Sequence, residues 1–294
     1  MHISNCFNYV GSKDRVIDVI DKNLNKNKKF FIDVFCGSGV VGINETTNYS
    51  KILLNDRCWQ LVETLKYFRS NKVNKTLKDI DYVINQFNLS KTNKEGFIKL
   101  REYYNDNFAD KETFNPMLFY CLVTHAFNYN IHINKSGKFS VPSGANRCYF
   151  NSSLRNKLRD FQDTLNTFKG QVTFKCEDFE QLIMSSDKVI KDSMFYVDPP
   201  YLSSDDSYSR IHYLGKWNTA KEEKLYKCLD YINNKGGSFL LSNVLVNNGK
   251  INHTLIDWSQ KYQVVDVQAD YSNCNYQRKN LGDTREVLVR NYEV

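Results

Sequence analysis

Apolar residues recur along this 294-residue chain as short β-branched and aromatic runs, and each run leads through a turn signal into a helical pattern. Residues 29–35 form the first run, the glycine turn Cys36–Gly39 follows, and a helix is predicted from Val40. Residues 51–56 form a second run that ends in an acid, and residues 59–68 have the spacing of a helix. A strand, a glycine turn, a helix and a strand ending in an acid are typical of the front half of a Rossmann-like nucleotide site.

The pattern becomes mainly helical between residues 71 and 168. The predicted helices cover residues 77–87, 97–104, 116–127 and 152–168. Between the last two lies a polar segment, 128–149, in which Ile131 and Ile133 alternate with polar neighbours before a turn at 135–138. Alternation on both sides of a turn predicts a β-hairpin. We therefore expect a mainly helical insertion that carries one β-hairpin.

After residue 168 the alternation of strands and helices resumes. Strands are predicted at 171–175, 194–197, 238–242, 263–267 and 285–289, the last one antiparallel, and helices at 219–233 and 253–262. Thr219 to Glu222 has the form of a capping box that begins a helix, and Gly236-Gly237 ends that helix. The prediction is an α/β fold with a Rossmann-like sheet, built from residues 1–70 and 169–294 around the insertion at 71–168.

Composition and charge narrow the class of protein. Hydrophobic residues make up 41% and charged residues 25% of the chain, as in a soluble globular protein, and no apolar run is long enough for a membrane span. The eight cysteines are dispersed without a C-x-x-C pair, which predicts no zinc site and a reducing, cytoplasmic setting. The formal net charge of +7 is compatible with a polyanionic partner such as nucleic acid.

Asp198-Pro199-Pro200-Tyr201 is the most informative motif. It directly follows the predicted strand at 194–197, and ligands bind at the carboxyl ends of strands in open α/β sheets. Each proline fixes φ near about −65° and has no N–H, which leaves the carbonyl of Pro199 free to face a ligand. The Asp198 carboxylate and this carbonyl can accept two hydrogen bonds from one amino group. Tyr201 can stack on the flat ring that carries the amino group.

A nucleotide pocket is expected upstream of this motif. The glycines in Asp33–Gly39 allow a ligand to approach the backbone, and Asp56 can accept hydrogen bonds from ribose hydroxyls. No Walker-type lysine follows, and G-x-G-x-x-G is incomplete. A nucleotide without phosphate, such as S-adenosylmethionine (AdoMet), therefore fits better than NAD or ATP. The alternatives are a tight turn without a ligand and, for Asp56, an acid that caps the next helix.

Other prominent residues have a simpler interpretation. Ser12 is predicted to cap the amphipathic helix at 16–24. His125 lies in the apolar helix and is expected to be a core residue rather than a catalyst, and Trp217 and Trp258 are expected to pack rather than bind. A Ser-His-Asp hydrolase is not supported, because the chain has no G-x-S-x-G elbow.

The order of these motifs resembles the alpha-group N6-adenine DNA methyltransferases, the Dam-like enzymes, and phage-type Dam in particular. The glycine motif at 33–42, a variable insertion and the motif at 198–201 follow one another in the family's order, with further matches at 127–134 and from Glu286. The resemblance spans nearly the whole chain. It implies methyl transfer from AdoMet, leaving S-adenosyl-L-homocysteine (AdoHcy), to N6 of an adenine in double-stranded DNA. It also implies that residues 1–70 and 169–294 are catalytic and that residues 71–168 recognise the target.

The resemblance, together with the glycine motif, gives the expected site. The residues expected to line the AdoMet pocket are Tyr9, Gly11, Lys13, Asp33, Phe35, Cys36, Gly37, Ser38, Gly39, Asp56, Asp178, Phe179 and Asp198. In catalysis Asp198 and the Pro199 carbonyl would accept the two hydrogens of N6, with Pro200 in the same rigid motif. Tyr201 would stack on the adenine after the base has left the helix. Neither a metal nor a covalent cysteine is required.

The DNA is expected to contact the hairpin and a second basic segment. The candidate DNA-binding residues are Asn130, His132, Asn134, Lys135, Lys138, Asn146, Arg147, Arg278 and Lys279. The hairpin would enter the major groove, where Asn suits adenine and Arg suits guanine, although some of these residues could only brace the hairpin. Dam-like enzymes that read GATC tend to use arginines and a methionine here. Asn130 and His132 depart from that pattern, so a GATC target is not predicted.

Two other classes stay open at this stage. One is a methyltransferase that acts on RNA or protein, in which case the insertion would bind another substrate. The other is a catalytically idle DNA-binding protein that keeps the fold. For the leading interpretation we expect a monomer or weak dimer on DNA, encoded by a bacterium or phage, either as an orphan enzyme or within a restriction–modification system.

Overall fold

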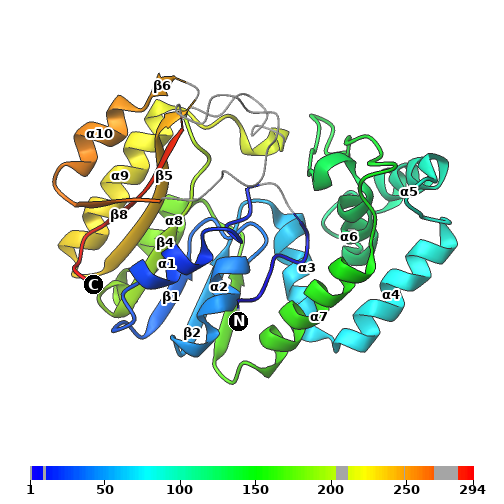
Figure 1. Ribbon diagram of the computed structural model, residues 1–294, viewed down its shortest axis with the longest axis horizontal. Coiled ribbons are helices and arrows are strands. Elements are labelled where there is room, and N and C mark those ends of the chain that lie inside the picture. Colours follow the sequence, from blue (N-terminus) through cyan, green and yellow to red (C-terminus); the bar gives the residue numbers. More distant parts are fainter. Residues whose placement is uncertain (1, 9–10, 203–210, 248, 268–283) are drawn as a thin grey trace.

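The computed structural model describes residues 2–8, 11–202, 211–247, 249–267 and 284–294. These residues form an eight-stranded sheet with helices on both faces and a further group of helices beside it (Figure 1). Three candidates from the sequence, Tyr9, Arg278 and Lys279, lie outside the described residues.

The strand order of the sheet is β3-β2-β1-β4-β5-β8-β7, and the short β6 pairs with β5. The strands are β1 Phe30–Asp33, β2 Lys51–Asn55, β3 Gln171–Lys175, β4 Ser193–Val197, β5 Ser238–Asn247, β6 Lys250–Ile251, β7 Gln263–Asp266 and β8 Arg285–Arg290. Strands β1 to β5 are parallel, whereas β8 is antiparallel to both β5 and β7, which confirms the predicted direction of the last strand. The order reverses at β1, between β2 and β4, and ligands bind outside the carboxyl ends of strands at such a switch point.

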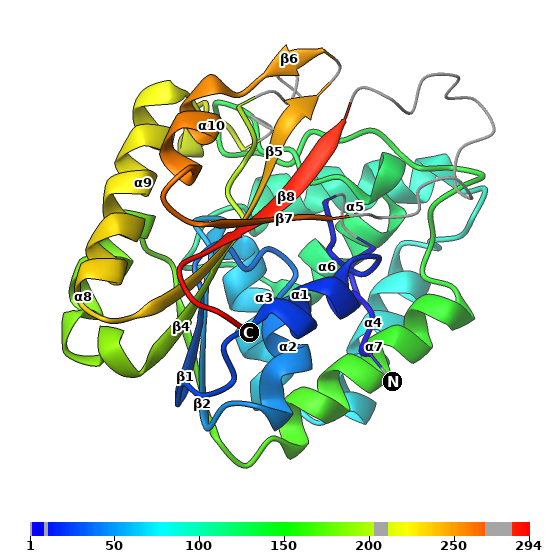
Figure 2. The same ribbon diagram turned by 60° about the vertical axis from the view of Figure 1, so that its left-hand side comes forward.

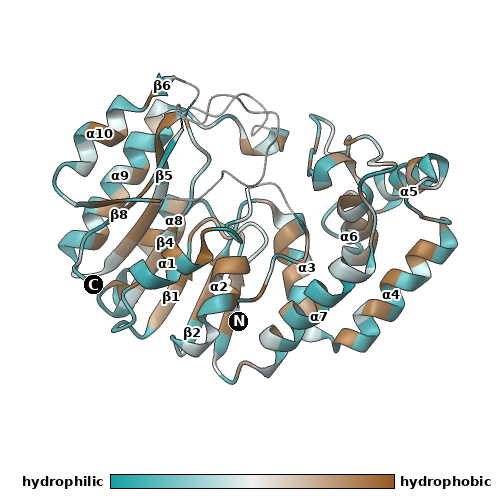
Figure 3. Cartoon of the chain, in the orientation of Figure 1, coloured by the Kyte–Doolittle hydropathy of each residue, from teal (hydrophilic) through white to brown (hydrophobic). Residues whose placement is uncertain are grey.

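Helices cover both faces of the sheet (Figure 2), and alternate residues of the central strands pack into these two opposite layers. Phe31 and Met194 pack in the layer of α1 (Ile17–Asn23), α2 (Val40–Asn44) and α3 (Trp59–Ser70). Ile32 and Phe195 pack in the layer of α8 (Phe179–Ser185), α9 (Thr219–Asn234) and α10 (His253–Ser259). A strand with apolar residues on both faces requires this cover on both sides. Hydrophobic residues accordingly concentrate along the strands, whereas the flanking helices also carry hydrophilic residues (Figure 3).

The region after α3 is mainly helical, as predicted. Its α-helices are α4 Val73–Gln86, α5 Lys94–Asn107, α6 Pro116–His125 and α7 Ser152–Thr167. Short 3-10 helices occur at η1 Glu45–Thr47, η2 Phe127–Tyr129, η3 Asp187–Asp192 and η5 His212–Leu214. The core continues from the sheet into this region, because Phe68 of α3 contacts Tyr120 of α6 with ring centroids 5.6 Å apart. Among the described residues, no helix is both long and apolar enough to cross a membrane.

The predicted hairpin at 128–149 forms its turn but not its strands. Across the turn, the described residues form two isolated antiparallel bridges, one between the buried Ile133 and Phe139 and one between Ala126 and Ser143. Gly137, with φ of 76°, closes the turn. At the start of the segment, Asn128 has φ of 53°, which interrupts the extended backbone that a strand needs. The segment is therefore an irregular loop held by isolated bridges, backbone hydrogen bonds and buried apolar residues.

Two predicted helix caps are wrong. The hydroxyl of Ser12 accepts a hydrogen bond from the backbone N–H of Asp14 at 3.3 Å, and α1 begins later without a side-chain cap. Asn218, rather than Thr219, caps α9, because its side-chain oxygen accepts the backbone N–H three residues on at 3.0 Å. Glu222 is thus no capping-box partner, and its side chain is completely buried in the interior.

Candidate functional site

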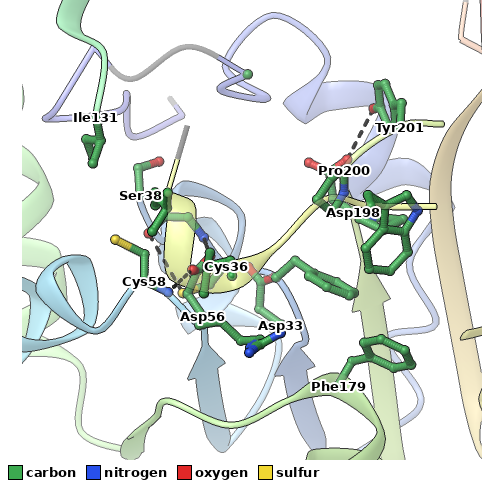
Figure 4. Close-up of a pocket in the computed structure, with 18 of the residues that line it drawn as sticks. Asp33, Cys36, Ser38, Asp56, Cys58, Ile131, Phe179, Asp198, Pro200 and Tyr201 are labelled. Atoms are coloured by element: carbon green, nitrogen blue, oxygen red, sulfur yellow. Dashed lines mark hydrogen bonds between the residues drawn. The ribbon is translucent and has the colours of Figure 1, made fainter. Parts of the chain in front are cut away.

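A cavity of about 250 Å³ lies at the carboxyl ends of β1, β2 and β4 (Figure 4). Most of the residues predicted from the sequence are in its wall, namely Gly11, Lys13, Asp33, Phe35, Cys36, Gly37, Ser38, Asp56, Asp178, Phe179, Asp198, Pro199, Pro200 and Tyr201. The N-terminal segment, the glycine turn and the Asp-Pro-Pro-Tyr motif are far apart in the sequence. The fold brings them together around one cavity, as the motif order predicts.

Of the described residues expected in the AdoMet pocket, Gly39 is the one that does not line this cavity. It directly precedes α2 with φ of 77°, and a side chain built on it would contact Leu54 and Leu65 at 3.4 Å in the core. The left-handed backbone is costly for residues with a Cβ. Gly39 therefore serves to turn the chain into α2.

Asp56 ties the glycine turn to the end of β2. One carboxylate oxygen accepts the backbone N–H of Gly37 at 2.9 Å, and the other accepts the N–H of Cys58 at 2.7 Å. Burial raises the pKa of Asp56, while these two N–H groups act in the opposite direction. Asp56 thus keeps the turn in place and presents a carboxylate to the cavity, and α3 begins without a side-chain cap from it.

A polar cluster forms around the Asp-Pro-Pro-Tyr motif. The Lys13 ammonium lies 3.1 Å from an oxygen of Asp198 and 3.1 Å from an oxygen of Glu286. The Tyr201 hydroxyl, 2.6 Å from this ammonium, is 3.2 Å from the same Asp198 oxygen and 3.1 Å from the same Glu286 oxygen. Ser242 of β5 also reaches Glu286, at 3.5 Å. Two carboxylates, one directly after β4 and one on β8, are thus bridged by one ammonium and one phenol.

Burial and the neighbouring charges set the protonation of this cluster. Burial alone would lower the pKa of Lys13, but Asp198, Tyr201 and Glu286 outweigh it and raise that pKa well above its usual value. Burial raises the pKa of Asp198, and the charge of Glu286 raises it further, while Lys13 opposes both. Lys13 is therefore a permanent cation near neutral pH, held between two carboxylates.

Two further polar side chains end in the cavity wall without a hydrogen-bond partner on the end atom. Among the described residues, Asp33 Oδ1 and the Tyr196 hydroxyl have no such partner, although both residues are about 1% exposed. Burial raises the pKa of Asp33 well above its usual range, and the charges of Asp198 and Asp56 act in the same direction. Buried polar atoms are normally satisfied, so these two atoms are suited to a bound ligand that donates hydrogen bonds or carries positive charge.

Three aromatic rings form one side of the cavity. The ring centroids of Phe35 and Phe179 are 5.9 Å apart, and Trp217 lies 5.8 Å from each of them. The sequence assigned Trp217 a packing role alone. It does pack, but it also lines the cavity. Trp258, by contrast, stacks on Tyr226 at 4.3 Å and is absent from the wall.

Several wall and cluster residues were not predicted from the sequence. They include Arg57, Tyr196, Ser242, Lys221 and Glu286. Glu286 lies 88 residues from Asp198 along the chain, and only the placement of β8 beside β5 brings it close. Arg57 directly follows Asp56 and pairs with Asp178 at 3.5 Å, so its position after the acid was a usable signal.

The predicted DNA-binding residues separate into three groups. Asn130 lines the cavity instead of pointing away from it. Asn134 braces the turn, because its side-chain oxygen accepts the backbone N–H groups of Ser136 and Lys138, both at 3.0 Å. His132, Lys135, Lys138, Asn146 and Arg147 are exposed.

Some of these exposed residues have protein partners. The His132 ring is 2.8 Å from the Ser140 hydroxyl, and Lys138 pairs with Asp106 at 3.2 Å. Asn146 has φ of 69° and donates its backbone N–H to a carbonyl at 2.6 Å, so it shapes the loop. Asn134 and Asn146 therefore brace this segment, and the contact of any of these residues with DNA stays a prediction.

His125 is a core residue, as predicted. It is 4% exposed, and its Nδ1 lies 2.8 Å from the Cys121 carbonyl oxygen. Burial lowers the pKa of this histidine to about 4. Within the described residues, no group of three or more His, Cys, Asp or Glu side chains could hold a metal ion.

Comparison with known proteins shows which protein family matches this chain. The family model for D12 class N6 adenine-specific DNA methyltransferases matches residues 9–273. The chain is 35% identical over 292 residues to the Type II methyltransferase M.FokI of Planomicrobium okeanokoites and 34% identical over 295 residues to the modification methylase StsI of Streptococcus sanguinis. Each alignment covers 99% of this chain but 43% of the relative, so the chain spans less than half the length of these proteins. A DNA adenine methylase of Haemophilus influenzae is 27% identical over 213 residues, which cover 66% of this chain and 62% of that protein.

Proposed function

This chain belongs to the D12 class N6 adenine-specific DNA methyltransferase family, and we propose that it transfers the methyl group of AdoMet to N6 of an adenine in double-stranded DNA. The observation that carries the proposal is the cavity shared by the Asp-Pro-Pro-Tyr motif at 198–201 and residues 36–38 of the glycine turn. A methyl donor and a flat amino-bearing ring can meet there. Residues 1–70 and 169–294 would do the chemistry, and residues 71–168 would select the DNA.

The side chains in the cavity fit AdoMet. The unpartnered oxygen of Asp33 suits a positively charged donor such as the ammonium of AdoMet, and Asp56 is placed to accept hydrogen bonds from ribose hydroxyls. The rings of Phe35 and Phe179 offer an apolar, flat-walled space for adenine. AdoMet, when bound, supplies an electrophilic methyl group.

The target amino group would be held by the Asp-Pro-Pro-Tyr motif. Asp198 accepts a hydrogen bond from N6, and the Pro199 carbonyl accepts the second one. Each hydrogen bond to a charged group is worth roughly 1.5–3 kcal/mol. Lys13 and Tyr201 already contact one oxygen of Asp198, and these contacts fix the orientation of the carboxylate. Tyr201 would stack its ring on the adenine while its hydroxyl stays in the polar cluster.

The chemistry balances with the residues at hand. The N6 lone pair forms the new bond to the methyl carbon, the carbon–sulfur bond breaks, and the sulfur keeps that electron pair. N6 then loses one proton, for which Asp198 is an acceptor within hydrogen-bonding reach of the amino group. Burial raises the pKa of Asp198, which makes it a better proton acceptor than an exposed aspartate.

DNA selection is proposed for the exposed part of the loop at 128–149. His132, Lys135 and Arg147 are exposed there and could contact base edges or phosphates. Asn130 lines the cavity, so it would contact the flipped base rather than the groove. The adenine must leave the helix to reach Asp198, which costs a few kcal/mol, and contacts of Lys and Arg with phosphate would offset this cost.

Methyl transfer can be tested with labelled AdoMet and plasmid DNA, RNA or protein as acceptor. We expect label in DNA alone, with N6-methyladenine as the product. Asp198→Ala should lower the single-turnover rate by about 10- to 150-fold, because one charge-assisted hydrogen bond to N6 is lost. Its affinity for AdoHcy should change little. Asp257→Ala, which removes an exposed carboxylate on α10, should leave the rate unchanged.

Two outcomes would overturn the proposal. Label in RNA or protein but not in DNA would assign the cavity to another acceptor. No label in any acceptor, with DNA still retarded in a gel, would identify an idle DNA-binding protein.

A further inference from the structure

Glu222 is a completely buried carboxylate on α9 that accepts hydrogen bonds from four side chains. Its Oε1 accepts from Tyr226 at 2.6 Å, from Asn243 at 2.9 Å and from Asn252 at 3.1 Å. Its Oε2 accepts from the indole N–H of Trp217. A buried carboxylate is costly unless its oxygens are satisfied, and these four donors meet that need.

The two oxygens of Glu222 serve different parts of the molecule. Oε1 joins α9 to Asn243 of β5 and to Asn252, the N-cap of α10, so it holds the interior of the fold. Oε2 holds Trp217, which is the one of the four donors that lines the cavity. The indole N–H is the only polar group of tryptophan, so this bond fixes which edge of the ring faces Glu222.

The ring of Trp217 completes the aromatic side of the cavity. Its plane is nearly perpendicular to that of Phe35, at 85°, and tilted by 58° from that of Phe179. Asn218, the next residue, caps α9 and so fixes the backbone beside Trp217. Both the backbone and the ring edge of Trp217 are therefore set by α9, although the ring itself belongs to the cavity.

From these contacts we propose that Trp217 is a wall of the subsite for the cofactor's adenine ring and that Glu222 is the positioning residue that holds it there. The ligand's identity rests on the proposed function. The hydrogen bond from Trp217 to Glu222 would keep the indole from turning into the cavity or away from it. Ligand binding at this wall should then depend on a carboxylate that does not itself line the cavity.

Glu222→Gln gives a selective test, because the two oxygens have different donors. The amide oxygen can keep the three donors at the Oε1 position, which turns the amide NH₂ toward the indole N–H of Trp217. Two donors then face each other, so only the bond to Trp217 is lost. Tyr226→Phe is the matched control, because it removes a donor from the same carboxylate without touching the cavity wall.

The measurement is AdoHcy affinity by titration calorimetry on the whole chain, with urea unfolding to verify that each variant is folded. Aromatic contacts are worth about 0.5–1.5 kcal/mol, so Glu222→Gln and Trp217→Phe should each weaken AdoHcy binding by about 2- to 12-fold. Trp217→Leu should weaken it more, and Tyr226→Phe should leave it within about twofold of wild type. Indole fluorescence should respond to AdoHcy in the wild type and in Trp258→Phe, and should lose most of that response in Trp217→Phe.

The outcomes separate this inference from the proposed function. Wild-type protein that binds no AdoHcy would overturn the proposed cofactor, and the subsite with it. Wild-type protein that binds AdoHcy, with affinity unchanged in both Trp217→Phe and Trp217→Leu, would overturn the role of Trp217 alone. Equal weakening by Glu222→Gln and Tyr226→Phe would show that Glu222 acts through the general stability of α9.

Discussion

Glu286 is the residue whose substitution tests the polar cluster around Asp198 most directly. Its Oε1 lies 3.1 Å from the Lys13 ammonium, which is also 3.1 Å from an oxygen of Asp198. The two carboxylate oxygens therefore cannot be farther apart than about twice that distance. Glu286→Gln removes one negative charge from this cluster and keeps the size of the side chain.

The geometry gives the size of the effect. Two unit charges about 6 Å apart interact by about 3 kcal/mol at an effective dielectric constant of about 20, and these side chains are mostly buried. The charge of Glu286 raises the pKa of Asp198, so its removal lowers that pKa. Without Glu286, Lys13 has Asp198 as its remaining carboxylate partner in the described cluster, which lowers the pKa of Asp198 in the same direction.

Glu286→Gln should therefore shift the pH profile of methyl transfer and lower its rate. In the proposed mechanism the ionised form of Asp198 accepts a hydrogen bond from N6, so the methylation rate should rise with pH as Asp198 loses its proton. Glu286→Gln should move this acid limb toward lower pH. Lys13 should also compete more strongly with N6 for Asp198, and the loss of one hydrogen bond to a charged group should lower the plateau rate by about 10- to 150-fold.

The assay is the single-turnover methylation rate against pH, at saturating AdoMet and DNA. Glu293→Gln, the same substitution at an exposed position near the end of the chain, should leave the profile unchanged. An acid limb that moves toward higher pH in Glu286→Gln would refute the charge argument. An unchanged profile with an unchanged rate would remove Glu286 from the functional cluster.

Three shorter predictions concern stability and DNA. Because burial lowers the pKa of His125 to about 4, the unfolded chain binds more protons than the folded one between pH 4 and about 6.5, so stability should fall by about 3 kcal/mol as the pH drops through that range. His125→Gln should flatten this dependence in urea unfolding curves at pH 7 and pH 5. Gly39→Ala forces a Cβ into the left-handed region and should cost roughly 1–2 kcal/mol in thermal unfolding. Arg147→Ala should reduce the slope of log K against log salt for DNA binding by about one, and Lys138→Ala should reduce it less, because Lys138 already pairs with Asp106.

The local sequence pattern predicted the strand boundaries that depend on neighbouring residues alone. The strand β3 has the predicted bounds, and the Asp-Pro-Pro-Tyr motif lies at the end of β4 because a short apolar run and two prolines determine that boundary. Most residues of the cavity wall could be predicted for the same reason, because Asp33, Asp56 and Asp198 all lie at the ends of parallel strands. The side-chain partners of these acids did not follow, because they depend on which strands become neighbours.

The capping box predicted at Thr219 is wrong because the local sequence offers two neighbouring N-cap residues. Asn218 and Thr219 are both good caps, so the sequence left the start of α9 ambiguous by one residue. With Asn218 as the cap, Glu222 falls on the inner face of the helix, where Tyr226, Asn243 and Asn252 provide donors. Glu222 therefore accepts hydrogen bonds from four buried or partly buried side chains and makes no capping-box hydrogen bond at the helix end.

Residues 212–217, which follow the Asp-Pro-Pro-Tyr motif, contact parts of the fold that are far apart in the sequence. The backbone N–H of His212 donates to the carbonyl of Ile133, in the loop proposed to select DNA, at 2.9 Å. Tyr213 donates to Gln60 of α3 at 2.7 Å, and Trp217, five residues further on than His212, lines the cavity. One short segment thus contacts the loop, a helix beside the sheet and the cavity wall. A boundary drawn along the sequence separates residues that these hydrogen bonds hold together, so residues 212–217 support both the loop at 128–149 and the cavity.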